Sequence, residues 1–361
     1  MDLNNSSIHE TRGIDSYKRY TARKIIVGVS LLTAVLILSV VAVSAGSTDL
    51  SPNDVLMAFI GQGTESSTLV IWRIRLPRVI AAIIAGAGLA ASGCVMQNNL
   101  NNPLASPSTL GISNAAAFGA NIAIILLGAG GIRSSSADAV NISNPYVVTL
   151  CAFAASMTAV FVILMLARYK GFSPESIILT GVALSSLFSA GTILIQYFAD
   201  DVQVASAVFW TFGDLGRISW NEAGILCVVS VISLIYFMFR RWEYNAIDCG
   251  EEGAKSLGVK VENIRLGGLL VSSIITAVSV SFVGIIGFIG LISPQIVRRI
   301  IGGDHRFLIP ISALMGSVLL LIADTAARTI ISPVILPVGA ITSFLGAPIF
   351  FYLLLRGHDR K

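Results

Sequence analysis

Apolar segments long enough to cross a bilayer recur along the whole chain, and they constrain its fold more than any other feature. A membrane-spanning helix needs about 20 residues. Nine segments approach or exceed this length, and they cover residues 25–45, 79–97, 112–129, 146–167, 177–198, 222–239, 267–286, 308–327 and 338–355. A tenth, shorter apolar segment covers residues 289–301 in a region interrupted by glycine and proline. The sequence therefore predicts an all-α polytopic membrane protein of about ten transmembrane helices.

The composition agrees with this fold class and leaves no room for a soluble domain. Hydrophobic residues make up 55% of the chain and charged residues only 12%, whereas about a quarter of the residues in a soluble domain are charged. The four cysteines are scattered without the spacing of metal ligands. We expect a cytoplasmic N-terminal segment over residues 1–24, a single transmembrane domain over residues 25–356 and a cytoplasmic tail over residues 357–361.

The positions of the basic residues predict the topology. If ten crossings start from a cytoplasmic N-terminus, six of the 24 lysines and arginines fall outside, which leaves 18 inside. Cytoplasmic loops carry most of the Lys and Arg of membrane proteins, so this count favours cytoplasmic N- and C-termini in a multi-pass protein of the cell membrane. The six residues that fall outside are Arg73, Arg75, Arg78, Arg133, Arg217 and Arg328.

Three of these arginines are clustered, which is an exception to the rule. Arg73, Arg75 and Arg78 directly precede the apolar segment 79–97 on the outer side. A guanidinium group stays charged and can bind a carboxylate through two hydrogen bonds. The cluster therefore favours either an acidic partner outside the membrane or lipid headgroups.

Ionisable residues inside the apolar segments are rare, and Asp324 is the main one. It lies near the outer end of the segment 308–327, and Arg328 follows one helical turn later on the same face. An ion-coupled secondary transporter needs an ionisable coupling group in its membrane helices, and in this chain Asp324 would have to be that group. The alternative is a local ion pair between Asp324 and Arg328, and we expect the pair.

Two polar interruptions separate apolar segments. Residues 97–107 (QNNLNNPLASP) contain two prolines and four asparagines, which end one helix and start another. Residues 287–295 (GFIGLISPQ) contain Pro294, which we expect to start the short helix with Ser293 as its N-cap. The chain contains no GxxxxGK[ST] loop, so it cannot bind and hydrolyse ATP by that route.

An ordered series of motifs resembles the FecCD-type permeases, the membrane subunits of ABC importers for iron–siderophore complexes, haem and cobalamin. The series covers the chain from about residue 20 to its C-terminus. Its members are RLPR at 75–78, GLAASG at 88–93 with Gln97, NPLASP at 102–107 with Leu110 and Gly111, GEE at 250–252, LGV at 257–259, GFIGL at 287–291, DHR at 304–306, AD at 323–324 with AR at 327–328, LPVG at 336–339 and GAPIF at 346–350. Each motif alone is weak, but their common order is specific.

The resemblance implies a type II ABC importer architecture and a set of partners. Permeases of this family have ten helices and work as dimers, with two cytoplasmic ATPase subunits and an extracytoplasmic substrate-binding protein. By resemblance, Arg75, Arg78 and Arg328 occupy the positions that dock the acidic surface of the binding protein. Arg73 has no such match and is better explained by lipid headgroups. ATP and Mg²⁺ belong to the partner ATPase, and we expect no cofactor, metal or nucleic acid on this chain.

Further residues receive roles from the same resemblance. The segment 248–259 is the expected coupling segment, which contacts the ATPase through a short helix; its residues are Gly250, Glu251, Ala254, Leu257 and Gly258. Ala254 and Leu257 are expected to form the face that the ATPase covers. Residues Ser173, Pro174 and Glu175 resemble the cytoplasmic gate, with weaker motif support. Asn102, Pro103, Pro294 and Gln295 are structural motif positions, and Gln295 stands where the family usually has a histidine, so it cannot titrate.

The sequence implies transport without catalysis by this chain, but it does not identify the substrate. We expect a permease that imports a metal chelate, with iron–siderophore favoured by its frequency in the family and with corrinoid (cobalamin) and haem as alternatives. A second permease chain completes the pathway, as a homodimer or with a close paralogue. A membrane enzyme is the poorest alternative, because the three histidines (His9, His305 and His358) all lie in polar segments.

Overall fold

The computed structural model describes residues 3–46, 62–132, 140–142, 144–169, 173–332 and 334–357, and the single residues 55, 57, 58 and 60. The long helices are α1 (Leu3–Ser44), α4 (Leu76–Asn99), α6 (Pro145–Tyr169), α7 (Pro174–Tyr197), α9 (Trp220–Phe239), α12 (Val261–Val283), α14 (His305–Thr329) and α15 (Val338–Gly357). The shorter elements are α3 (Glu65–Leu69), η1 (Val70–Arg75), η2 (Pro107–Leu110), α5 (Ile112–Asn121), η3 (Ile122–Leu126), α8 (Asp201–Thr211), η4 (Leu215–Arg217), α10 (Arg241–Asp248), α11 (Glu251–Ser256), α13 (Ile289–Ile301) and the strands β1 (Gly130–Ile132) and β2 (Val140–Ile142).

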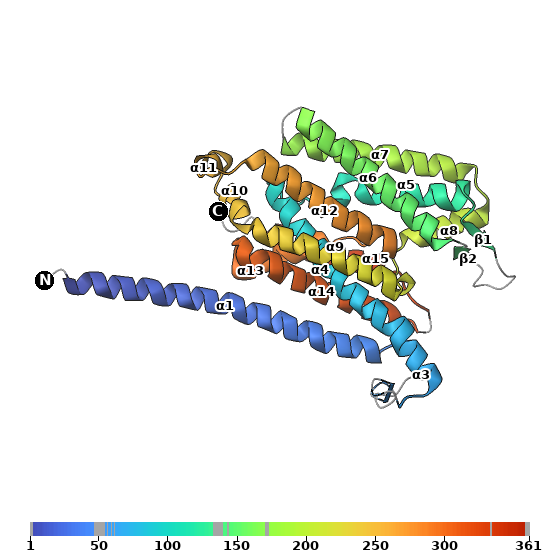
Figure 1. Ribbon diagram of the computed structural model, residues 1–361, viewed down its shortest axis with the longest axis horizontal. Helices are drawn as coiled ribbons and strands as arrows, with labels where there is room; N and C mark the ends of the chain where they lie inside the picture. Colours follow the sequence, from blue (N-terminus) through green and yellow to red (C-terminus); the bar gives the residue numbers. More distant parts are fainter. Residues whose placement is uncertain are drawn as a thin grey trace.

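The long helices run back and forth between two ends of the molecule (Figure 1). Seven of the described helices are long and apolar enough to cross a membrane, and residues Ile112–Leu126 and Val338–Tyr352 form two shorter apolar helices. Each lies on one of the nine predicted segments, and α13 lies on the tenth. The start of α1 and the end of α15 lie at the end of the molecule that holds α10 and α11, which we call the inner end. The opposite, outer end holds α3, α8 and the β1–β2 hairpin.

Helix α4 forms the centre of the bundle, where it contacts α9, α12, α13 and α14. It is buried along nearly its whole length, because small residues let the neighbouring backbones approach closely. A Cβ atom added to Gly86 would lie 2.5 Å from the carbonyl oxygen of Gly316 in α14, and Gly316 faces Gly86 in the same way. Gly93 likewise lies against the carbonyl oxygen of Gly290 in α13. The glycine- and alanine-rich motif at 88–93 therefore packs helices together.

Helix α13 begins five residues earlier than we expected. Pro294 was expected to start it, but the helix runs from Ile289 to Ile301 with Pro294 inside. Proline lacks an N–H group, so it leaves the carbonyl oxygen four residues earlier without its helical hydrogen bond. That oxygen belongs to Gly290, and it lies against Gly93 of α4. The proline therefore lies at a position of α13 where the carbonyl oxygen that lacks its helical hydrogen bond faces the neighbouring helix α4.

Several elements were not predicted from the sequence. Helix α1 is continuous from Leu3, so the helix includes most of the expected N-terminal segment 1–24. Helices α8 and α10 lie between the predicted apolar segments, where no helix was expected, and β1 pairs with β2 in an antiparallel hairpin. Residues 1–2, and residues 358–361 of the expected C-terminal tail, lie outside the described residues.

Candidate functional site

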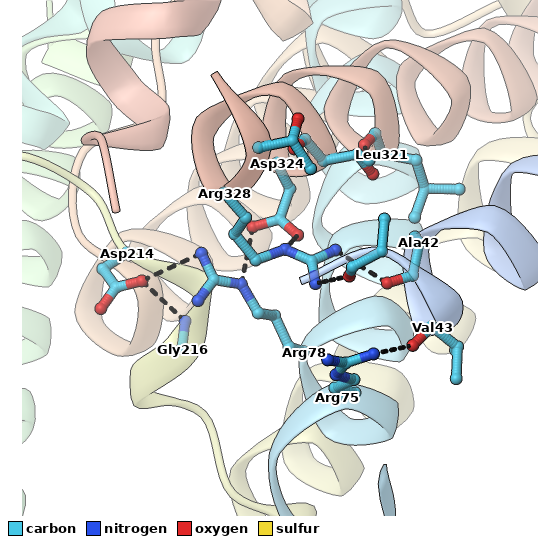
Figure 2. Close-up of polar contacts among 12 residues, drawn as sticks. Ala42, Val43, Arg75, Arg78, Asp214, Gly216, Leu321, Asp324 and Arg328 are labelled. Carbon is cyan, nitrogen blue, oxygen red and sulfur yellow. Dashed lines mark hydrogen bonds and ion pairs between the residues drawn. The ribbon is translucent and has the colours of Figure 1, made fainter. Parts of the chain in front are cut away.

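Three arginines predicted from distant parts of the sequence converge at the outer end (Figure 2). Arg75 ends η1, Arg78 lies in the first turn of α4, and Arg328 lies in the last turn of α14. Each of the three is only 4% exposed. We call these arginines, together with Asp324 and Asp214, the outer arginine network. The fold thus brings together the three residues that were assigned to docking, but it buries them within a single chain.

Asp324 lies at the centre of this network and is fully buried. Its Oδ1 accepts a hydrogen bond of 2.8 Å from Nε of Arg78, and its Oδ2 accepts one of 3.1 Å from Nε of Arg328. The expected ion pair between Asp324 and Arg328 is therefore confirmed. The second pair, with Arg78, was not predicted. A buried carboxylate is tolerated when ion pairs and hydrogen bonds satisfy it, and here one carboxylate joins α4 to α14.

The end of α1 supplies partners for two of the arginines. Arg75 Nη1 donates to the carbonyl oxygens of Val43 and Ser44, both at 2.8 Å. Arg328 donates to Ala45 O at 2.8 Å and to Ala42 O at 3.0 Å. The last carbonyl groups of a helix lack helical partners and carry partial negative charge. Arg75 and Arg328 therefore cap the C-terminus of α1 and hold it against α4 and α14 (Figure 2).

Arg78 differs from the other two arginines because one side of its guanidinium is held only by a partly exposed acid. Its Nη2 lies 3.5 Å from Oδ1 of Asp214, whose side chain is 40% exposed. The same Oδ1 accepts a hydrogen bond of 2.8 Å from the backbone N–H of Gly216. Nη2 has no hydrogen-bond partner among the described residues. Asp214 therefore covers a buried guanidinium nitrogen that has no hydrogen bond within the described residues, and nothing in the sequence pointed to this acid.

Burial changes what docking by these residues requires. The interior contacts of Arg75 and Arg328 would have to be replaced by an incoming carboxylate, whereas Nη2 of Arg78 lies next to a partly exposed group. Arg73, which was assigned to headgroups, is exposed on η1. Among the predicted docking residues, Arg78 is therefore the best placed to meet an external carboxylate.

The inner end carries the predicted coupling segment. Residues Glu251–Ser256 form α11, with two acidic residues in the first turn and Lys255 in the last, an order that the helix dipole favours. Gly250 and Gly258 flank the helix with φ angles of +107° and +81°, a region that favours glycine. The two apolar residues that were assigned to the surface covered by the ATPase differ in exposure. Ala254 is buried in this chain, whereas Leu257 is 74% exposed. Of these two, only Leu257 is exposed for a partner.

Helix α11 is attached to the bundle by Glu251. This side chain accepts hydrogen bonds from Lys255 Nζ and Arg265 Nη1, at 2.8 Å and 2.9 Å. The hydrogen bond from Lys255 and the neighbouring Arg265 lower the pKa of Glu251. Because Arg265 belongs to α12, the coupling segment is connected directly to a long helix of the bundle.

Gln295 forms a bridge between two helices and the polar interruption. Its Nε2 donates to Gln97 Oε1 and to Pro103 O, both at 3.0 Å, and Gln97 Nε2 donates to Leu291 O at 3.1 Å. An uncharged amide performs this bridging without titration. Asn102 makes a local turn, in which its Oδ1 accepts from Leu104 N at 2.9 Å. The four structural motif positions thus lie around the α4–α13 contact.

The residues assigned to the cytoplasmic gate start α7 at the inner end. Ser173 is the N-cap, Pro174 is in the first turn, and the exposed Glu175 accepts a hydrogen bond of 2.7 Å from Ser173 Oγ. This is the usual chemistry of a helix start.

Within the described residues, no group of three His, Cys, Asp or Glu side chains could hold a metal ion.

Comparison with known proteins identifies the class of this architecture. Residues 32–356 match the FecCD transport family. A protein of Methanocaldococcus jannaschii described as an ABC transporter permease is 58% identical over 344 residues, which cover 95% of this chain and 98% of that protein. The iron(3+)-hydroxamate import permease FhuG of Bacillus subtilis is 33% identical, over 94% of this chain and all of that protein (100%). The vitamin B12 import permease BtuC of Vibrio vulnificus is 34% identical, over 91% and 93%.

A solved structure agrees with these relatives. It is described as an inward-facing metal-chelate type ABC transporter, and it matches with a TM-score of 0.78 and 28% identity over 92% of this chain and 99% of that one. The predicted all-α membrane fold of about ten helices is therefore confirmed. The protein is the non-catalytic permease subunit of an ABC importer for metal chelates, and it belongs to the FecCD transport family. As such a subunit it works with ATPase and binding-protein partners.

Proposed function

We propose that this permease imports an iron–siderophore complex delivered by an extracytoplasmic binding protein. The support is the similarity to a permease named for iron(3+)-hydroxamate import, together with the structural match to a metal-chelate transporter. A permease named for vitamin B12 import is equally similar. Corrinoid and haem therefore remain the alternative substrates, and a direct comparison of chelates is the appropriate test.

The state of Asp324 supports ATP-driven import over an ion-coupled carrier. A coupling carboxylate has to bind and release an ion during transport. Asp324 is instead fully buried between Arg78 and Arg328, at 2.8 Å and 3.1 Å. This single observation removes the one acid on which a carrier mechanism for this chain would depend. The energy then has to come from a partner, which is the two cytoplasmic ATPase subunits that bind ATP and Mg²⁺.

The ATPase subunits, the binding protein and the second permease chain each contact a different surface of this protein: the inner end, the outer end and one side of the helix bundle. The ATPase subunits contact the coupling segment 248–259 through the exposed Leu257. The binding protein docks at the outer arginine network, where a partner carboxylate first meets Arg78 and then reaches Arg75 and Arg328. A second permease chain, as a homodimer, covers part of the apolar surface of α7, where only 11% of the residues in an apolar 18-residue stretch are buried within one chain. Ser173, Pro174 and Glu175 form the cytoplasmic gate at the start of α7.

The orientation in the cell membrane follows from these assignments. With α11 facing the ATPase, the inner end is cytoplasmic, and so are the start of α1 and the end of α15. The charge distribution supports the same orientation, because the clusters at residues 18–24, 240–241 and 298–306 are all at the inner end. The outer arginine network then faces the side from which substrate arrives.

Reconstitution tests the proposal directly. The permease, its ATPase and its binding protein are placed in liposomes, and ATP hydrolysis is measured with the binding protein preloaded with ferric hydroxamate, haem or cobalamin. We expect the largest stimulation, and uptake of the chelate, with ferric hydroxamate. Larger stimulation by cobalamin or haem would reassign the substrate. Uptake by the permease alone, driven by an ion gradient, would overturn the ABC importer mechanism.

A further inference from the structure

Two buried asparagines at the inner end of α4 are not explained by the proposed sites. Asn98 and Asn99 are the last two residues of this central helix, and both side chains are buried. In the sequence they are the first part of the polar interruption 97–107, which is otherwise a turn. Buried amides need hydrogen-bond partners, so their partners reveal what the helix end is attached to.

Asn98 connects α4 to the residue that ends α10. Its Nδ2 donates to Asp248 Oδ1 at 2.6 Å and to Tyr244 O at 3.2 Å. Asp248 is the first residue of the coupling segment and lies three positions before Glu251, where α11 starts. A hydrogen bond to an ionised carboxylate is stronger than one between neutral groups. The central helix is therefore joined to the coupling segment by a short, directional contact.

Asn99 leads to the same segment by a second route. Its Nδ2 donates to the carbonyl oxygen of Arg265 at 3.2 Å, and Nη1 of Arg265 donates to Glu251 Oε2 at 2.9 Å. Both routes use only the Nδ2 side of each amide, because Oδ1 of Asn98 and Oδ1 of Asn99 have no hydrogen-bond partner among the described residues. The two contacts therefore depend on donation by the amides.

The opposite end of α4 carries Arg78 of the outer arginine network. A single uninterrupted α-helix, 24 residues long, thus has its first turn in the outer network and its last two residues linked to the coupling segment, directly through Asn98 and by way of Arg265 through Asn99. Such a helix moves as a rigid element, and its displacement at one end appears at the other.

We propose that Asn98 and Asn99 are positioning residues that transmit movement between the coupling segment and α4, and so between the ATPase and the outer end. This inference rests on the proposed ATPase contact at 248–259. Binding-protein docking at the outer end then stimulates ATP hydrolysis through α4, and ATPase closure moves α4 through Asp248 and Glu251. Without the amide donors, docking of the binding protein no longer stimulates ATP hydrolysis, and closure of the ATPase no longer moves α4.

A swap of the two hydrogen-bonding groups tests the Asn98 contact. Asn98→Asp keeps the shape but removes the donor and places two carboxylates together. Asp248→Asn keeps an acceptor for Asn98 but removes its charge, so its loss of stimulation is expected to be smaller than that of Asn98→Asp. In the double variant Asn98→Asp with Asp248→Asn, the new amide donates to the new carboxylate, so the bond is restored with its direction reversed. Asn101→Asp is the matched control, because it adds the same charge at an exposed position of the same interruption.

The readout is the stimulation of ATP hydrolysis by the binding protein in the reconstituted complex, with docking affinity and thermal unfolding measured in parallel. For Asn98→Asp we expect stimulation to fall about tenfold, the factor that one hydrogen bond to a charged group supplies, while the binding protein still docks. The double variant should recover most of the stimulation, and Asn101→Asp should match wild type.

The outcomes separate this inference from the proposed function. If wild type shows neither stimulation nor chelate uptake, the proposed function fails. If wild type is stimulated and Asn98→Asp is stimulated equally, the positioning role is refuted. If Asn98→Asp does not fold, the double variant decides: a folded double variant that remains unstimulated also refutes the role, and a stimulated one supports it.

Discussion

The outer arginine network makes Asp324 the residue whose loss should destabilise this protein most. Asp324→Asn removes the negative charge between Arg78 and Arg328 but keeps the size of the side chain. One amide oxygen can still accept from one guanidinium, while the amide NH₂ meets the donors of the other. Removal of one partner from a buried ion pair costs about 3–5 kcal/mol. Because one acceptor survives, we expect a loss at the lower end, about 3 kcal/mol.

A matched variant in the same network tests the reasoning. Asp214→Asn removes the other acid that faces Arg78, but this side chain is 40% exposed and 3.5 Å away. Exposed pairs contribute about 1 kcal/mol or less, so the expected loss is several-fold smaller. Both proteins are purified in detergent, and unfolding is followed by heat and by denaturant. Equal destabilisation by the two substitutions, or none by Asp324→Asn, would show that the buried pairs do not stabilise the outer end as described.

Three further predictions concern docking, packing and pH. Arg78→Gln should weaken binding of the acidic partner while Asp214→Asn strengthens it, with both effects smaller at high salt; identical affinities in surface plasmon resonance would exclude Arg78 as the first contact. Gly93→Ala should lower the unfolding temperature because its Cβ meets a carbonyl oxygen of α13, whereas Gly224→Ala, which meets nothing within 4 Å, should be neutral or slightly stabilising. Burial opposes ionisation of Asp304, but hydrogen bonds from α10 and its own helix start, with nearby cations, lower its pKa overall. An acid whose pKa is lowered in the folded state stabilises the protein at pH values above its ordinary pKa of 3.8, and this stability is lost as the pH falls through the pKa of the folded state. Asp304→Asn should therefore weaken the dependence of the unfolding free energy on pH in the acid range. An unchanged pH dependence would contradict this.

Local sequence signals predicted the helices well, because each span needs only a run of apolar residues. The same applies to the Asp324–Arg328 pair, whose four-residue spacing places both side chains on one helix face. The partnership of Asp324 with Arg78 could not be derived in this way, since 246 positions separate the two residues. Their contact depends on how α4 crosses α14, which the glycines permit but do not specify.

The wrong prediction for Pro294 and the features that the sequence did not reveal have equally local causes. Pro294 was interpreted as a helix start because proline is common there, but inside α13 it suits a carbonyl oxygen that faces another helix. Motif resemblance assigned Arg75, Arg78 and Arg328 to an external partner, and it contains no information about burial. Asp214 and the partners of Asn98 carried no motif at all. The sequence therefore revealed the arginines of the outer network and its central acid, Asp324, but neither Asp214 nor the contact between Asp324 and Arg78.

The glycine contacts of α4 have a consequence for how the transporter can change shape. Where Gly86 faces Gly316 and Gly93 faces Gly290, backbone lies directly on backbone, without an intervening layer of side chains that could repack. Helices joined in this way cannot slide or roll past one another without collision of main-chain atoms. Helices α4, α13 and α14 should therefore move together, as one rigid block, during the transport cycle. The opening and closing of the pathway then falls to the loosely covered helices at the edge of the bundle, and α7 is one of these.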